Sequence, residues 1–146
     1  MQISSRLSIA VHVLTCIGMF KNDFKLTSAF LASSVNVNPV VIRRLLLQLK
    51  AAGIVEVTRG SGGAEIVKPL NEISMLDIYN AVECVDEGKL FNFHENPNPD
   101  CPVGKNIHNV LDRKLDQIQK AMENEMRGIT MEDIINDAKR FIAGEK

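Results

Sequence analysis

Hydrophobic positions near the start of the chain recur at helical spacing on two sides of one segment, which extends from Ser5 to Phe20. Its two apolar stripes are Leu7, Ala10, Val11, Leu14 and Ile17, and Ile9, Val13, Cys16 and Phe20. A helix that is apolar on two sides is buried on two sides. The pattern therefore predicts a central core helix.

Two short helices are predicted next along the chain. Thr27 is the expected N-cap of a helix over residues 28–34. Asn38 followed by Pro39 predicts a second start, because asparagine caps well and proline suits the first helical position. This second helix is expected to end at Ala52, before a glycine. Two short helices separated by about four residues predict a helix-turn-helix.

The second of these helices is amphipathic, with apolar residues at helical spacing on one side. Its expected inward positions are Val41, Ile42, Leu45, Leu46 and Leu49. Its expected outward positions, nearer to solvent or a partner, are Val40, Arg43, Arg44 and Lys50. In the turn between the two helices, Asn36 is suited to left-handed backbone.

The period of the pattern changes to two over residues 54–58 and 64–67, which predicts a β-hairpin. Its tip, Arg59-Gly60-Ser61-Gly62-Gly63, is rich in glycine but has neither the Walker spacing nor the dinucleotide fingerprint. A hairpin that directly follows a helix-turn-helix is typical of the wing of a winged helix. The tip of such a wing approaches the backbone or minor groove of DNA, which favours a role for Arg59.

The remaining pattern predicts a helix from Met75 to Glu87, a loop over 88–104 and a long helix from Lys105 to Met126. The fold class is thus mainly α with a small β-hairpin wing. The predicted organisation is a winged helix-turn-helix domain over 1–87, a loop that is a candidate sensor over 88–104, and a dimerisation helix with a C-terminal helix over 105–146.

The long helix has a narrow apolar stripe and is longer than packing on so small a domain requires. We expect the stripe to form a homodimer interface, and packing within the monomer is the alternative. The predicted interface residues are Ile107, Leu111, Leu115, Ile118 and Met122. A last helix, capped by Thr130, is expected to return over this interface.

Charge is distributed unevenly, although the net charge of the 146 residues is only −1. The first 70 residues hold 8 basic and 3 acidic side chains, whereas the rest hold 9 and 15. A basic N-terminal segment favours a polyanionic partner such as double-stranded DNA. The three cysteines are widely spaced, and the apolar start is interrupted by polar residues. We therefore expect no disulfide framework, no signal peptide, no membrane span and a cytoplasmic location.

An enzyme and a protein-interaction module are the alternatives to a DNA-binding protein. An enzyme would need a nucleophile, a base and a group that stabilises charge, yet His12, His94 and His108 belong to no recognisable triad or metal motif. We expect no catalysis. A winged helix that only binds proteins is the alternative to DNA binding, and the basic N-terminal segment argues against it.

Several short stretches of the chain form a recognisable set, which is MQISSR at 1–6, AGIV at 52–55, RGSGG at 59–63, ISMLDI at 73–78 and AVE at 81–83. Together they resemble the Rrf-two family of bacterial transcription regulators. The resemblance covers nearly the whole chain. It implies a homodimeric repressor whose two winged helices bind the half-sites of a pseudo-palindrome, with the long helices crossed at the two-fold axis.

Candidate DNA contacts follow from the predicted elements. Arg43 and Arg44 can reach guanine edges or phosphates, and Val40 can contact a thymine methyl group. Hydroxyl groups, a guanidinium and helix N-termini can position phosphates. The predicted DNA-binding residues are Ser4, Arg6, Ser28, Asn38, Val40, Arg43, Arg44, Arg59, Ser61 and Gly62.

The resemblance also raises the question of an iron–sulfur cluster, which several members of that family hold with three closely spaced cysteines before the long helix. Cys101 fits the last of these cysteines. The two earlier cysteine positions are Lys89 and Glu95 in this chain. The position three residues after the last cysteine, which one member of the family also uses, is Gly104, and none of these three residues supplies a thiolate. Because such a cluster normally needs four ligands, we expect no cluster and no other cofactor.

Other roles for the loop stay open. His94, Cys101 and His108 are evenly spaced and could bind a soft metal, although no known metal motif is matched and no metal site is predicted. Cys101 could be a redox or electrophile switch, activated by the helix N-terminus and by Lys105. It could also have no sensory role. An effector, either a small molecule or a partner protein, is not specified by the residues.

Overall fold

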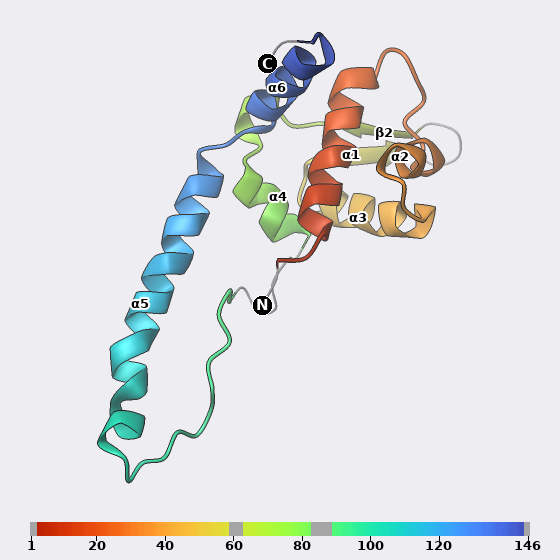
Figure 1. Cartoon of the computed structure of the whole chain (residues 1–146). Helices are drawn as coiled ribbons and strands as arrows, with labels where there is room; N and C mark the ends of the chain where they lie inside the picture. The colour runs from red at the N-terminus through yellow and green to blue at the C-terminus, as the bar shows by residue number, and fades with distance from the viewer. Residues whose placement is uncertain (1–2, 59–62, 83–88, 145–146) are drawn as a thin grey trace.

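A computed structural model describes residues 3–58, 63–82 and 89–144 (Figure 1). The elements, in chain order, are α1 Arg6–Phe20, α2 Ser28–Val35, α3 Pro39–Ala51, β1 Val55–Thr58, β2 Gly63–Ile66, the short 3-10 helix η1 Leu70–Glu72, α4 Met75–Ala81, α5 Pro102–Arg127 and α6 Met131–Ile142. Within these described residues, six α-helices and one two-stranded sheet make a mainly helical fold with a hairpin, so the predicted fold class is confirmed.

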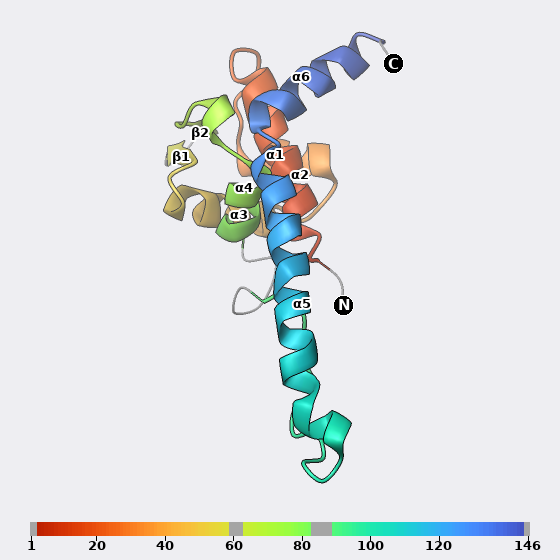
Figure 2. The same ribbon diagram turned by 90° about the vertical axis from the view of Figure 1, so that its left-hand side faces the viewer.

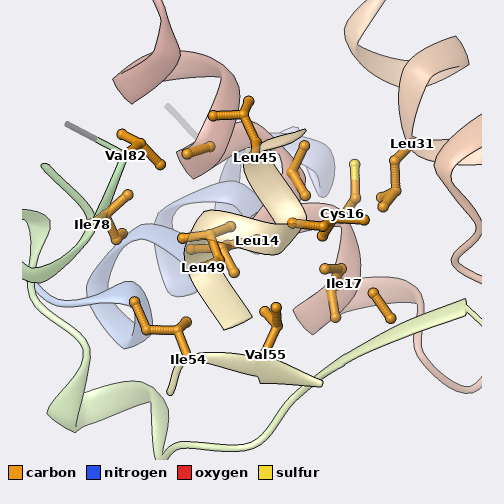
Figure 3. Packing of buried hydrophobic residues seen from close by; sticks show 14 of the residues in the cluster. Leu14, Cys16, Ile17, Leu31, Leu45, Leu49, Ile54, Val55, Ile78 and Val82 are labelled. Atoms are coloured by element: carbon orange, nitrogen blue, oxygen red, sulfur yellow. The ribbon is translucent and has the colours of Figure 1, made fainter. Parts of the chain in front are cut away.

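The core of the domain surrounds α1, as its two apolar stripes predict. Five of its residues are buried, and they meet buried residues of α2, α3, β1 and α4 (Figure 3). Leu14 of α1, Leu49 of α3 and Ile78 of α4 are among the fully buried side chains of this cluster. Burial of each such side chain stabilises the fold by about 1.5–3 kcal/mol relative to exposure.

The helix-turn-helix forms where the caps predict it. The Thr27 side chain accepts a hydrogen bond from the N–H of Phe30, and the chain bends by 111° between α2 and α3. Asn36 has a φ of 65°, which is left-handed backbone, and its N–H donates to the carbonyl of Ala32. Such a turn sets two short helices at the roughly 90–120° angle of DNA-binding helix-turn-helix motifs.

β1 and β2 pair antiparallel, with Val55 opposite Ile66 and Thr58 opposite Gly63. The N–H of Ala64 donates to the carbonyl of Leu26, so the segment before α2 lies along the outer edge of the hairpin. Gly63 has a φ of +78°, and a Cβ there would lie 2.8 Å from the Leu26 carbonyl oxygen. Glycine is therefore required at this position by both backbone conformation and space.

α6 differs from its expected place. It packs against α1 and η1, and Met131 and Ile135 belong to the buried core of the winged helix. Gly18 of α1 gives room for this contact, because a Cβ there would collide with the Ile135 side chain. The prediction that this helix returns over the interface is therefore corrected. Sequence spacing shows that a face is apolar and does not show which surface covers it.

Two predicted boundaries also change. α4 ends at Ala81, earlier than the predicted Glu87, and residues 83–88 lie outside the described residues. α5 begins at Pro102, earlier than the predicted Lys105, because Pro102 takes the first helical position after Cys101. The helix is 26 residues long, or about 39 Å, and extends away from the domain (Figure 2).

Within the described residues, no single helix is long and apolar enough to cross a membrane. The bent pair α2 and α3 meets that test by length and composition only when its two helices are counted together.

Candidate DNA-binding surface

The outer face of α3 is the strongest candidate for a DNA-reading surface. Its inner face, which includes Ile42, Leu45 and Leu49, is buried in the core. Arg43 and Arg44 are exposed on the outer face, and neither side chain has a hydrogen-bond or ion-pair partner among the described residues. Two unpaired guanidinium groups on a helix of a helix-turn-helix can bind base edges or phosphates.

Apolar side chains share this face with the arginines. Val40 is exposed, as predicted, and Leu47 is 66% exposed. The prediction that Val41 points inward is wrong, because its side chain is 36% exposed. Leu47 was missed by sequence reasoning, although it follows Val40 by seven positions and Arg43 by four, which places all three on one helix face. Apolar groups on such a face can contact thymine methyl groups.

The start of α3 is held by Asn38. Its side-chain oxygen accepts a hydrogen bond from the N–H of Val40 at 2.9 Å, and Pro39 occupies the first turn. Asn38 thus has a capping role that is independent of DNA. A rigid start presents the remaining N–H groups of the first turn, which favour an anion such as a phosphate.

Three other predicted contacts lie at the starts of α1 and α2. The hydroxyl of Ser4 accepts hydrogen bonds from the backbone N–H and the Nε of Arg6, each at 3.2 Å. These two candidates are therefore brought together, with the half-buried guanidinium oriented by the serine. Ser28 is the first residue of α2, directly after its cap. The predicted wing contacts Arg59, Ser61 and Gly62 lie outside the described residues.

The long helix α5 has no buried residue. Of the predicted interface residues, Ile107, Leu111 and Leu115 are half-buried, Ile118 is 53% exposed, and Met122 packs against the domain core. Val103 and Val110, which sequence reasoning missed, are also exposed. They precede Ile118 by fifteen and eight positions, and this near-heptad spacing places the three on one side of the helix.

The family model Rrf2, described as iron-dependent transcriptional regulator, matches residues 3–137. The chain belongs to the Rrf2 family. The resemblance to the Rrf-two family is thereby confirmed.

Relatives of this Rrf2 protein agree in sequence and fold. YwnA of Bacillus subtilis (strain 168), named as an HTH-type transcriptional regulator, is 46% identical over 134 residues, which are 92% of this chain and 97% of YwnA. A crystal structure described as that of a DNA-binding protein is 40% identical and covers 90% of this chain and 99% of its own, with a TM-score of 0.70. CymR, described as the global cysteine regulator of B. subtilis, is 18% identical, covers 93% of this chain and 97% of its own, and shares the fold with a TM-score of 0.67.

Together these findings identify a DNA-binding transcriptional regulator. This confirms the predicted class of function, and proteins of this class normally have no catalytic activity. In the fold shared with CymR, α3 and the hairpin are parts of a winged helix.

In this Rrf2 protein the loop before α5 lies along the helix. The N–H of Leu90 donates to the side-chain oxygen of Gln119 at 3.0 Å. The Phe93 ring stacks on His94 and lies 4.0 Å from the His108 ring, measured between centroids. His108 in turn contacts Asp112 at 3.1 Å. These contacts tie the loop to α5 at points from His108 to Gln119.

Cys101 ends this loop as the N-cap of α5. Its side chain is exposed and makes no capping hydrogen bond, whereas its backbone N–H donates to the carbonyl of Asn98 at 3.2 Å. The thiol is therefore open to solvent at the positive end of a long helix dipole. Cys16 is buried in α1, and Cys84 lies outside the described residues.

The family description names iron, and the described residues gather no set of ligands for it. Across residues 3–58, 63–82 and 89–144, no three His, Cys, Asp or Glu side chains come together as metal ligands. His94 and His108 both contact Phe93, yet Cys101 does not complete a set with them. A cluster held by cysteine thiolates would find only Cys101 in the described part of the loop.

Proposed function

We propose that this protein is a homodimeric repressor in which α3 of each protomer enters the major groove of one operator half-site. The single observation that carries the proposal is the outer face of α3. There Arg43 and Arg44 stand exposed and unpaired beside Val40 and Leu47, while the opposite face of the same helix is core. A surface that exposes apolar and cationic groups together suits the thymine methyl groups and guanine acceptors of a major groove.

The homodimer is supported by α5. This helix is about 39 Å long, has no buried residue and exposes Val110 and Ile118 on one side. Exposed apolar stripes of this kind mark protein–protein interfaces, and a second copy of the chain presents the same stripe. A two-fold pair of winged helices then matches a palindromic operator, and bound protein represses by obstructing the polymerase.

We further propose that regulation works without an iron–sulfur cluster and through Cys101. Support for the first part is the lack of gathered ligands among the described residues. Support for the second is the exposed thiol at the start of α5, the helix that would set the separation of the two winged helices. Oxidation or alkylation of the Cys101 thiol would change the charge or size of the N-cap residue and so alter the first turn of α5.

The test of DNA binding compares wild type with the double variant Arg43→Ala/Arg44→Ala. A labelled DNA duplex from the region upstream of the gene that encodes this protein is titrated with protein in the presence of excess non-specific DNA. In parallel, the protein is used to select its preferred sequences from a pool of randomised duplexes. Each lost arginine contact costs about 1–3 kcal/mol, so the double variant is expected to bind at least about 30-fold more weakly. The salt dependence of its affinity becomes shallower, because fewer phosphates are neutralised.

The matched control is Lys139→Ala, which removes an exposed positive charge from α6 and is expected to bind as wild type. Equal affinities for wild type and the α3 variant would show that α3 is not the reading helix. If folded wild-type protein selects no duplex at all, the winged helix is instead a protein-interaction module.

A further inference from the structure

A cavity of about 540 Å³ lies at the base of the wing, between the end of α1, the loop that follows it and β2. We propose that this wing-base cavity, lined by Ile17, Phe24, Leu70, Lys21, Lys25 and Lys68, binds a small organic anion with an apolar body. Its volume is within the roughly 300–1,000 Å³ of small-molecule sites. The proposed ligand is independent of the DNA contacts of α3.

The apolar part of the cavity suits a ligand body of aromatic or branched aliphatic character. Ile17 and Leu26, which both line it, are buried core residues and give it a rigid floor. Phe24 is half-exposed and is held by stacking on Phe30, with ring centroids 5.1 Å apart. A supported aromatic face that remains accessible can stack on a planar ligand.

The polar part of the cavity is strongly cationic. Lys21 and Lys25 lie in the loop between α1 and α2, and Lys68 follows β2, so two segments far apart in the chain bring three lysines to the lining of one cavity. Among the described residues that line it, Glu65 is the single carboxylate. None of the three lysines has a hydrogen bond or ion pair from its side chain within the described residues. Three lysines against one glutamate give the lining a net positive charge, which favours binding of an anion such as a carboxylate, sulfonate or phosphate.

The position of the cavity separates it from the DNA-reading surface. In both Figure 1 and Figure 2 the loop after α1 is at the top of the domain, whereas α3 lies along its lower side. A DNA backbone would use the lysines but leave the apolar floor without a partner, so the amphipathic lining favours a small molecule. Thr58 and Gly63 also line the cavity. They flank the wing tip in the sequence, so a bound ligand contacts the base of the wing.

The test uses 8-anilinonaphthalene-1-sulfonate, a fluorescent aromatic anion, and its uncharged counterpart N-phenyl-1-naphthylamine. Each is titrated into the full-length protein, and we expect saturable one-to-one binding of the anion. The variant Lys21→Gln/Lys68→Gln is expected to bind the anion at least about tenfold more weakly, because loss of one charge-assisted contact costs about that much affinity. The same variant is expected to bind the uncharged probe as wild type does. The control Lys139→Gln leaves both affinities unchanged.

A second variant, Phe24→Ala, tests the apolar half of the site. Because Phe24 is half-exposed, the variant is expected to fold, which circular dichroism verifies, and to bind both probes more weakly. Absence of saturable anion binding by folded wild type would overturn the proposal. Anion binding that is unchanged in the double lysine variant would overturn it too, because the probe would then occupy another apolar surface such as α5. Loss of operator affinity in the lysine variant, without anion binding by wild type, would assign these lysines to DNA phosphates instead.

Discussion

Ser74 and Thr130 face each other across an isolated antiparallel bridge, and each is the N-cap of a helix. Both form a complete capping box, Ser74 with Asp77 of α4 and Thr130 with Asp133 of α6. The N–H groups that follow the two caps donate to backbone carbonyls of the opposite segment, each at 2.8 Å. The starts of α4 and α6 are thus joined at one point, which also anchors the end of α5 to the winged helix.

This junction predicts that the C-terminal helix unfolds together with the domain. Thr130→Ala is expected to lower the free energy of unfolding by about 1 kcal/mol, the usual cost of a lost N-cap. Tyr79, the single tyrosine, lies buried in α4 and reports on the core of the domain. Urea denaturation followed by its fluorescence should therefore show the lower midpoint. Ser33→Ala, on the exposed side of α2, is the control and should change stability by less than about 0.5 kcal/mol. A Tyr79 transition unaffected by Thr130→Ala would mean that α6 is a separate unit.

Gly53 and Gly63 have nearly equal φ angles but different surroundings. Alanine substitutions at the two positions therefore distinguish the cost of left-handed backbone from the cost of a steric clash. Gly53 has a φ of +77° and open space around it, whereas Gly63 has a φ of +78° and the Leu26 backbone beside it. Gly53→Ala is expected to cost about 1 kcal/mol from left-handed backbone alone. Gly63→Ala is expected to cost about 2 kcal/mol more, because the added methyl group collides with a carbonyl that cannot move freely. Denaturant midpoints of the two variants give the comparison, and equal losses would show that β2 is not held against Leu26.

The exposed stripe of α5 predicts the oligomeric state. Val110→Lys/Ile118→Lys places two charges where a second α5 would pack, so the variant should elute as a monomer in size-exclusion chromatography with light scattering. Asn109→Lys adds a charge at a neighbouring exposed position away from the stripe and should remain dimeric. Helix content measured by circular dichroism should be the same in all three proteins. A dimer that persists in the double variant would place the interface elsewhere.

The exposed thiol of Cys101 predicts a response to oxidants. Treatment of wild type with peroxide or an alkylating electrophile is expected to weaken operator binding by about tenfold or more, equivalent to 1.4 kcal/mol. Cys101→Ser should bind DNA and show no such response, while Cys84→Ser should respond as wild type. Gel shift before and after treatment measures the change, and mass spectrometry locates the modification. The same loss of binding in wild type and Cys101→Ser would exclude this cysteine as the sensor.

Elements whose signals are local were predictable from the sequence. Thr27, Asn38 and Ser74 each cap the helix that the sequence predicts at that position, because an N-cap acts on N–H groups two or three residues away. The helix-turn-helix, the hairpin and the long α5 follow from such caps and from periodicity. Predictions of burial were wrong where burial depends on whether another part of the chain covers the side chain. Val41 is an example, because its apolar side chain lies at the edge of the buried face of α3.

The sequence by itself thus determined the order of the elements, the winged-helix class and the family, since these depend on short motifs and on the spacing of apolar residues. Only the tertiary structure decided that α6 docks on α1, that Ser74 meets Thr130, and that lysines of the loop after α1 line one cavity together with a lysine that follows β2. The physical reason is that a periodic pattern records that a face is buried without recording its partner. Contacts between residues far apart in the chain are set by packing of the whole core, which no local pattern contains.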